Sequence, residues 1–575
     1  MPMNSENSQT SVDVCPLGFV AVLSPNADSA AEDMLRRILP DLVDGPYQQR
    51  SLPGMAMAAR DDNLSISLTS DGQRDVVLLG HLVSECVGPE HAVSWAVSAI
   101  IEGRYQQLSK CQGVFVLLVL DWTTRTIAVA GDLLGTKPLY VAVREGVTIL
   151  SDRAEAAVRL GGAEVDPLGL AGWYHFCAPL VNRTLFDSVE RLPPATVVHF
   201  DGRTKREERF WVPPIAEEPI SPEDLMDGFC EEFSQSLSRL LAPYDSATSL
   251  LSGGFDSRLA LLTALAENRW KLNAITTPYS DAEKQVVRQL ASLTGIDCEE
   301  VHIKHDFWDE FDQMWFVHPD GFPTIKTMSY LCIARSGSAG PFIDGSISAV
   351  AIRCHSGNPK DGPPANEAAA RAFVWKVHAH ELPYMYFRPE AAHHLEHLGR
   401  QAADEQSDAI GWNSKFCLLW DMYGDERRLT SLNFLQFAHR ACSVQPFYDR
   451  SLIERHLRHP QAMSSQEFYR ALLKRRFPGP GALPHADETS KGPNTGYLFS
   501  RTLWREIPAV AAFVHRHRDS LNSRWILPRL GSYALGWRRH MYVVLALTRL
   551  LRLEQELSRY GLDLDFGSIF ARGQA

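Results

Sequence analysis

Short hydrophobic runs of strand length dominate the chain between residues 14 and 210. Two helix-like patterns, near 28–38 and 91–102, fall between these runs. Because the predicted strands are closely spaced and outnumber the helices, the pattern indicates a layered α/β domain of mostly antiparallel strands. The seven predicted strands are 18–23, 65–70, 76–82, 114–122, 126–130, 139–143 and 196–200.

The pattern changes near residue 225, where strand-like and helix-like segments begin to alternate, as is typical of a parallel sheet. Ser280 and Glu283 predict a capping box for one of the helices, and Gly295 predicts its end. Beyond about residue 365 the chain reads mainly as helix, with Pro/Gly-rich interruptions at 358–364 and 478–484 that we interpret as mobile loops. The alternating segments are strand 248–251, helix 258–267, strand 272–277, helix 280–294 and strand 298–303.

One turn between a predicted strand and a predicted helix carries most of the chemical information. Residues 252–258 read SGGFDSR, so adjacent glycines follow the strand and open the helix. Backbone N–H groups and the helix dipole converge at such a turn and bind phosphate. A Walker-type loop would end in Gly-Lys-Ser/Thr, which is missing here. We therefore expect the turn to grip pyrophosphate, with Asp256 holding Mg²⁺, although a plain capped turn is the alternative.

The composition is that of an ordinary globular protein, with 45% hydrophobic residues, 22% charged residues and a net charge of −12. The negative charge argues against general nucleic-acid binding. From residue 496 onward, however, the chain has 12 Arg and no Lys against 6 acidic residues, which indicates either contact with nucleotide or acidic peptide, or solvated helix faces. The scattered cysteines, and the lack of a secretory signal or membrane-spanning run, favour a reduced cytoplasmic protein.

Several segments of the chain resemble the asparagine-synthetase-like ATP pyrophosphatases. Besides the glycine turn they include residues 130–140, AGDLLGTKPLY, then 445–449, QPFYD, and 489–492, TSKG, in the family's order. The resemblance implies an α/β fold with two domains. Residues 1–215 would form a degenerate class II glutamine-amidotransferase-like domain with αββα layers, and residues 216–575 an adenine-nucleotide-hydrolase-like parallel-sheet synthetase domain with a helical extension.

The family activity that this resemblance implies is ATP-dependent amide synthesis. A substrate carboxylate attacks the α-phosphate of ATP, pyrophosphate leaves with Mg²⁺, and an amine then attacks the acyl-adenylate. Lys491 and Arg258 are the implied catalytic residues, Lys491 by stabilising charge during amide formation. Asp256 is an implied Mg²⁺ ligand, and Asp344 either joins it or caps the following turn. The implied ATP contacts are Leu250, Ser252, Gly253, Gly254, Asp256, Ser257 and Thr276.

Departures from the family pattern narrow the choice of amine donor. Glutamine-using members carry a cysteine directly after the initiator methionine, but Pro2 occupies that position here. Cys15 could serve only if the preceding residues were removed, and the family's Asn-Gly-Glu segment is absent near 79–81. In the synthetase domain, CSV at 442–444 replaces Glu-x-Arg, and residues 341–348 keep only Asp344 as a carboxylate.

These features most resemble the lasso-peptide macrolactam synthetases. In that group an Asp or Glu side chain of a precursor peptide is adenylated and captured by the peptide's own α-amine, so proximity supplies much of the rate. The resemblance implies a precursor peptide as substrate, a leader-processing protease and a leader-binding protein as partners, and neither nucleic acid nor membrane. A β-lactam or carbapenam-type synthetase, ammonia-dependent asparagine formation and a non-catalytic peptide-binding scaffold are the alternatives.

Overall fold

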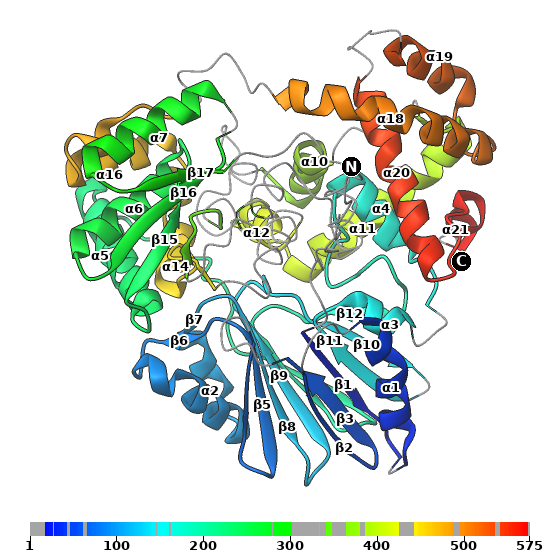
Figure 1. Cartoon of the computed structure of the whole chain (residues 1–575), viewed down its shortest axis with the longest axis horizontal. Coiled ribbons are helices and arrows are strands. Elements are labelled where there is room, and N and C mark those ends of the chain that lie inside the picture. Colours follow the sequence, from blue (N-terminus) through cyan, green and yellow to red (C-terminus); the bar gives the residue numbers. More distant parts are fainter. Residues whose placement is uncertain are drawn as a thin grey trace, which may run out of the picture.

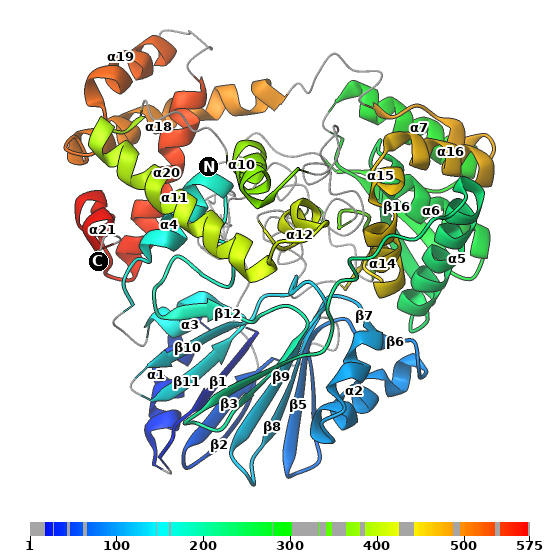
Figure 2. The same cartoon turned by 180° about the vertical axis from the view of Figure 1, so that it is seen from behind.

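A computed structural model gives the fold of the chain (Figures 1 and 2). Within the residues that it describes, the chain forms two six-stranded antiparallel sheets, a five-stranded parallel sheet, a small two-stranded sheet and many helices. None of the described helices is long and apolar enough to cross a membrane. The described residues are 18–26, 28–42, 47–60, 66–144, 146–159, 163–278, 280–301, 330, 333, 341–347, 364–379, 386–424, 442–486, 495–534 and 541–572.

The two antiparallel sheets lie face to face and contain the first fourteen strands except β6 and β7 (Figure 1). Their strand orders are β12-β10-β11-β1-β3-β2 and β14-β13-β9-β8-β5-β4. All seven strands predicted from the hydrophobic pattern are present. In chain order the strands are β1 Phe19–Leu23, β2 Gln48–Leu52, β3 Met55–Ala59, β4 Ile66–Ser70, β5 Arg74–Gly80, β6 Val83–Ser84, β7 Cys111–Gln112, β8 Phe115–Asp121, β9 Thr126–Gly131, β10 Tyr140–Arg144, β11 Val147–Ser151, β12 Val189–Arg191, β13 Thr196–Phe200 and β14 Lys205–Arg209.

Alternate residues of each strand face different hydrophobic layers. Phe19 of β1 and Val116 of β8 pack between the two sheets, whereas Val20 packs among helices on the outer face of the first sheet. Helices α1 (Ala30–Leu42) and α3 (Ala154–Arg159) cover that face, and α2 (Ala92–Ile101) covers the outer face of the second sheet. The predicted αββα layers are confirmed, and because the central strands are buried on both faces, strands such as β1 and β8 read as continuous hydrophobic runs.

The parallel sheet follows in the order β17-β16-β15-β18-β19, which places β15 in the middle. Every neighbouring pair of its strands is parallel, as the alternating pattern predicted. Gly295 ends α7 in the left-handed conformation, with φ of 71°, as expected for a C-cap glycine. The elements are α5 Pro222–Leu241, β15 Ser246–Leu250, α6 Phe255–Glu267, β16 Lys271–Thr276, α7 Asp281–Thr294, β17 Cys298–Glu300, β18 Phe342–Ile343 and β19 Ser443–Val444.

The helical extension packs against the first domain as well as against the parallel sheet (Figure 2). One hydrophobic cluster joins Val20 of β1, Trp173 of α4 and Val543 of α20. The predicted boundary near residue 215 therefore does not separate two independent cores. The further helices are α4 Pro167–Phe176, α10 Glu367–His378, α11 Pro389–Ile410, α12 Phe416–Tyr423, α14 Arg450–Arg458, α15 Pro460–Met463, α16 Gln466–Arg476, α18 Thr495–Arg516, α19 Ser523–Ala534, α20 Met541–Arg559 and α21 Phe566–Arg572.

Several arginines of the basic C-terminal stretch are engaged within the chain. Arg552 pairs with Glu506 at 3.0 Å, and Arg516 pairs with Glu554. The guanidinium of Arg529 lies 3.7 Å from the ring centroid of Trp525. These three arginines are therefore engaged by residues of α18, α19 and α20, an arrangement that neither interpretation of the basic stretch specified.

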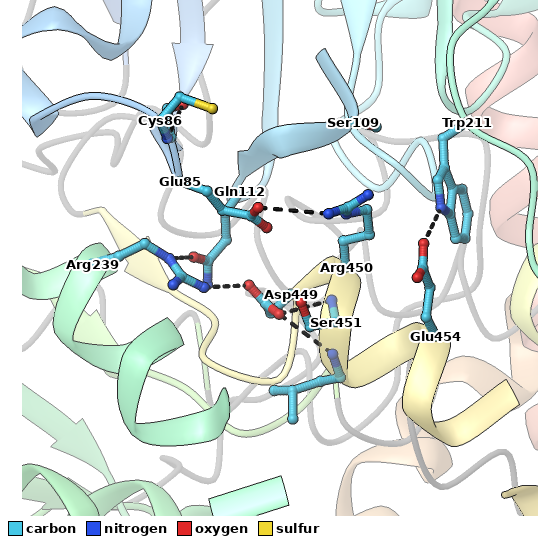
Figure 3. Close-up of polar contacts among 12 residues, drawn as sticks. Glu85, Cys86, Ser109, Gln112, Trp211, Arg239, Asp449, Arg450, Ser451 and Glu454 are labelled. Atoms are coloured by element: carbon cyan, nitrogen blue, oxygen red, sulfur yellow. Dashed lines mark hydrogen bonds and ion pairs between the residues drawn. The ribbon is translucent and has the colours of Figure 1, made fainter. Parts of the chain in front are cut away.

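Polar contacts join the first domain to the parallel-sheet domain (Figure 3). The guanidinium of Arg239 donates to Gln112 Oε1 at 3.0 Å and pairs with Asp449 at 2.7 Å. Asp449 also caps α14, since its carboxylate accepts from the backbone N–H of Ser451 at 2.9 Å. A buried carboxylate thus ties the start of α14 to β7 through α5. Glu85 with Arg450 and Trp211 with Glu454 pair across the same junction.

Candidate active site

The SGGFDSR turn lies at the carboxyl end of β15, the middle strand of the parallel sheet. Leu250 ends the strand, and α6 begins at Phe255. Gly254 is the N-cap of α6, and no side chain caps the helix there. Open α/β sheets bind ligands at this edge, and an uncapped helix N-terminus favours an anion. The sequence therefore predicted the position of the turn correctly.

The backbone N–H groups of the turn donate to acceptors of the chain itself. Ser252 N–H donates to Ser257 Oγ at 3.1 Å, and Gly254 N–H donates to Ser252 Oγ at 3.3 Å. The two hydroxyl oxygens lie 2.9 Å apart. Gly253 N–H donates to the carboxylate of Glu283 at 3.2 Å. The two serines that we expected to bind phosphate therefore shape the turn in this structure.

Gly253 has to be glycine because another segment of the chain crosses it. A Cβ atom added at Gly253 would lie 2.5 Å from the Cβ of Ala486. The backbone N–H of Ala486 donates to the carbonyl of Gly253 at 3.2 Å. The ring of His485 lies edge-on to Phe255, with centroids 4.9 Å apart. Residues 485 and 486 are therefore part of the wall of the turn.

Arg258, whose catalytic role stays a prediction, contacts the backbone in the structure. Its side chain is fully buried. Its guanidinium donates to the backbone carbonyls of Gly253 at 3.4 Å and Pro484 at 3.0 Å, and to that of Leu483. Since these contacts point away from solvent and towards backbone, the geometry makes Arg258 a positioning residue that fastens the 483–486 segment to the turn.

The Pro/Gly-rich stretch 478–484, which we interpreted as a mobile loop, is anchored at a few points. A Cβ at Gly481 would lie 2.2 Å from the carbonyl oxygen of Leu473, and Leu483 and Pro484 accept from Arg258. A Cβ at Gly479 would meet nothing within 4 Å, and the mobility of the stretch stays a prediction. The stretch 358–363, Lys491, Pro2 and Cys15 lie outside the described residues.

Asp344 follows β18 and lies beside the start of α6. A Cβ at the next residue, Gly345, would lie 3.2 Å from the Cβ of Asp256, so the structure brings the two predicted metal ligands into one neighbourhood. The carboxylate of Asp344 is buried and accepts hydrogen bonds from a phenol, a backbone N–H, a hydroxyl and a side-chain amide. These donors are Tyr330 Oη at 2.8 Å, Ser346 N at 2.8 Å, Ser346 Oγ at 2.9 Å and Gln445 Nε2 at 2.8 Å.

These four donors fill the acceptor positions of one carboxylate. The bond from Ser346 N–H is that of a turn-capping Asp. The structure therefore shows the capping contact of Asp344, and its role as a metal ligand stays a prediction. Within the described part of the chain, no group of three or more His, Cys, Asp or Glu side chains is arranged to hold a metal ion.

Thr276 ends β16, directly beside the turn. Its side chain is 2% exposed, and its Oγ1 has no hydrogen-bond partner among the described residues. A buried hydroxyl is costly to leave unpaired. The predicted nucleotide contact at Thr276 is untested, but this orphaned hydroxyl at the ligand-binding edge of the sheet fits a bound polar group.

Two motifs that the sequence placed more than 300 residues apart meet at the domain junction. The phenol of Tyr448, from the QPFYD motif, donates to the carboxylate of Asp132, from the AGDLLGTKPLY motif. The same oxygen accepts from Leu134 N–H at 2.7 Å. Burial raises the pKa of Asp132, and its hydrogen bonds with Tyr448 and the backbone only partly offset this. These motifs therefore hold the two domains together, a role that the sequence alone did not indicate.

Two departures from the family pattern also meet at this junction. The thiol of Cys442 hydrogen-bonds with His81 and with Tyr244. His81 Nε2 lies 3.2 Å from the carbonyl of Leu240, which can only accept, and His81 Nδ1 lies 3.4 Å from the phenol oxygen of Tyr244. Burial has the largest influence on the pKa of Cys442 and would raise it, but the charge of His81 together with the hydrogen bonds of His81 and Tyr244 lowers it. Burial would lower the pKa of His81, and Cys442 reverses that shift as well.

The contact between Cys442 and His81 predicts an unusually acidic thiol. The difference in absorbance at 240 nm between the native protein and the Cys442→Ser variant should reveal thiolate below the ordinary cysteine pKa of about 8.5. His81→Gln should move that titration to higher pH. Cys111 is the control, since burial raises its pKa to about 12. If Cys442 titrates no lower than an ordinary cysteine, the interpretation of this pair is wrong.

Residues 97–211 match the family model described as a glutamine amidotransferase domain. The N-terminal part of the chain is an amidotransferase-like domain. The match lies within the αββα layers and the segment that follows them, and it ends before the glycine turn. A search of curated proteins finds no match.

Two solved structures show similarity to this chain at 10% sequence identity. One is titled as the allosteric regulatory enzyme of purine biosynthesis, with a TM-score of 0.22 over 50% of this chain and 75% of that one. The other is glutamine phosphoribosylpyrophosphate amidotransferase from B. subtilis complexed with ADP and GMP, with a TM-score of 0.20. The latter match covers 45% of this chain and 60% of that chain, which is less than two thirds of its length. At these TM-scores the similarities carry no argument.

Proposed function

We propose that the protein is an AMP-forming amide ligase that closes a macrolactam ring in a precursor peptide, as lasso-peptide macrolactam synthetases do. The observation that carries the proposal is the SGGFDSR turn at the carboxyl end of a central parallel strand, where it opens a helix with no side-chain cap. Adjacent glycines and hydroxyls without a lysine suit the gripping of pyrophosphate better than the transfer of a γ-phosphoryl group.

In this proposal ATP binds along the carboxyl edge of the parallel sheet. The hydroxyls of Ser252 and Ser257 turn from each other to the phosphates, and Thr276 Oγ1 gains a partner. Asp256, in the first turn of α6, would hold Mg²⁺, which neutralises charge on the departing pyrophosphate. The chain runs from Ala486 at the turn to Lys491, which we propose stabilises the charge that develops as the amine attacks the adenylate.

The amine in this proposal comes from the substrate itself. We propose that the amidotransferase-like domain supplies no ammonia and instead supports the synthetase domain, to which the contacts of Tyr448 and Arg239 join it. The peptide α-amine, held near the adenylated side chain, then reacts at high effective concentration.

The substrate in this proposal is a precursor peptide freed of its leader. A leader-processing protease and a leader-binding protein would supply it in that form. The substrate carboxylate attacks the α-phosphorus of ATP and expels pyrophosphate. The α-amine then expels AMP and loses a proton, which gives a product one water lighter than the peptide.

The test is an incubation of the full-length protein with Mg-ATP and a leaderless core peptide. We expect AMP and pyrophosphate in equal amounts and a peptide product one water lighter by mass spectrometry. The same peptide with its α-amine acetylated is the control, because it can be adenylated but cannot close the ring. Formation of ADP, or ring closure without nucleotide turnover, would contradict the proposal.

A further inference from the structure

The helix that we expected to be closed by a capping box uses only half of that motif. Ser280 Oγ accepts from Glu283 N–H at 3.1 Å, as the box requires. The carboxylate of Glu283, in contrast, reaches across to the glycine turn and accepts from Gly253 N–H at 3.2 Å. Glu283 is buried, with 9% of its surface exposed. Glu283, which the sequence indicated as part of a helix cap, therefore belongs to the candidate nucleotide site.

The acceptors of the three N–H groups in the turn differ in charge. Ser252 and Gly254 donate to the hydroxyls of Ser257 and Ser252, which are neutral and can rotate to donate to a phosphate oxygen instead. Gly253 donates to a carboxylate, which carries negative charge and accepts only. The carboxylate of Glu283 therefore occupies the place at Gly253 that an oxygen of an anionic ligand would take.

The side chain of Glu283 is held against the glycine turn, where it would meet a bound anion. A Cβ at Gly253 would lie 3.3 Å from the Cγ of Glu283, so helix α7 packs directly on the turn. A phosphate oxygen at this N–H would face like charge at short range in a partly dry site, where such repulsion is strong. Asp344 does not take part in this contact, because its carboxylate is held by Tyr330, Ser346 and Gln445.

We propose that Glu283 makes pyrophosphate recognition at this turn dependent on the metal, by repelling the free anion and accepting the anion only in its complex with Mg²⁺. This inference rests on the proposed function, since it assigns the specificity of the same site. Complexation with Mg²⁺ cancels two of the negative charges of pyrophosphate that Glu283 repels, and the cation attracts the carboxylate in return. Glu283 is in this sense a specificity residue.

Calorimetric titration of inorganic pyrophosphate into the full-length protein tests the inference without any turnover. The native protein should bind pyrophosphate in Mg²⁺ and bind it at least about tenfold more weakly in EDTA. Glu283→Gln keeps an oxygen acceptor for Gly253 N–H but removes the charge, so the ratio of the two dissociation constants should fall at least about tenfold. Glu283→Ala should show the same fall, which covers the case in which the Gln variant does not fold.

Asp281→Asn is the matched control, because Asp281 is an exposed acid in the first turn of the same helix and the charge change is identical. The ratio of its dissociation constants for pyrophosphate in EDTA and in Mg²⁺ should equal that of the native protein. If both Glu283 variants keep the native ratio while the native protein binds Mg-pyrophosphate, the inference about Glu283 is wrong and the proposed function stands. If the native protein binds pyrophosphate in neither condition, the proposed function itself is wrong.

Discussion

Asp256→Asn is expected to lower the release of AMP and pyrophosphate at least about a hundredfold in the presence of Mg-ATP and core peptide. The substitution keeps the size of the side chain and its place in the first turn of α6. It removes the negative charge that, in the proposed function, holds the cation on the leaving pyrophosphate, and such neutralisation contributes several kcal/mol to a displacement of this kind. The measurement is the initial rate of AMP formation.

Two further variants test whether the loss is specific to Asp256 and to the adenylation step. Asp281→Asn makes the same charge change in the first turn of α7 and should release AMP at the native rate. Lys491→Ala should continue to release pyrophosphate as it forms the adenylate while the cyclised product is lost, because we propose that Lys491 acts only after adenylation. An Asp256→Asn variant with native AMP release would mean that Asp256 does not hold the cation, and normal cyclisation by Lys491→Ala would remove that lysine from the mechanism.

The sequence predicted the elements whose signal is local and missed those whose signal is not. The strands of the two antiparallel sheets that it identified are rich in Val, Ile and Leu. The edge strand β2 reads QQRSL and its neighbour β3 reads MAMAA, so neither shows the branched or alternating pattern of a strand. Pairing with β1 makes β3 a strand, and pairing with β3 makes β2 one. The pairing of β3 with β1 is long-range and leaves no local trace, whereas β2 and β3 form a tight hairpin that turns at residues 53 and 54.

The candidate site divides in the same way. The turn itself was predictable, because seven consecutive residues carry the glycines, hydroxyls and carboxylate that grip an anion. The contacts around the turn were not predictable. Glu283 fitted a capping box within its own helix, and Arg258 follows the turn directly, so the sequence did not show that either side chain packs against the turn. The hydrogen-bond donors of Asp344 come from three separate segments, at residues 330, 346 and 445. Only the fold shows which carboxylate is occupied and which faces the turn.

Replacing Arg258 is expected to lower the stability of the protein strongly. Arg258→Met keeps the length and the apolar part of the side chain but removes every donor. Three backbone carbonyls, those of Gly253, Leu483 and Pro484, then lose a charged partner. Hydrogen bonds to charged groups contribute about 1.5–3 kcal/mol each, and less where water can replace the donor, as at the exposed Pro484, so we expect the free energy of unfolding to fall by about 3–5 kcal/mol. Chemical denaturation in the absence of any substrate measures this fall.

Arg475→Met provides the comparison. Arg475 pairs with Asp227 at 2.9 Å on the surface, and about half of its side chain is exposed. Its loss should change stability by no more than about 0.5 kcal/mol. Hydrogen exchange should also show faster exchange at Ala486 N–H in Arg258→Met, because that N–H bonds Gly253. If Arg258→Met instead unfolds like the native protein and loses only AMP release, the arginine acts on the substrate, and the catalytic role indicated by its place in the sequence is the correct one.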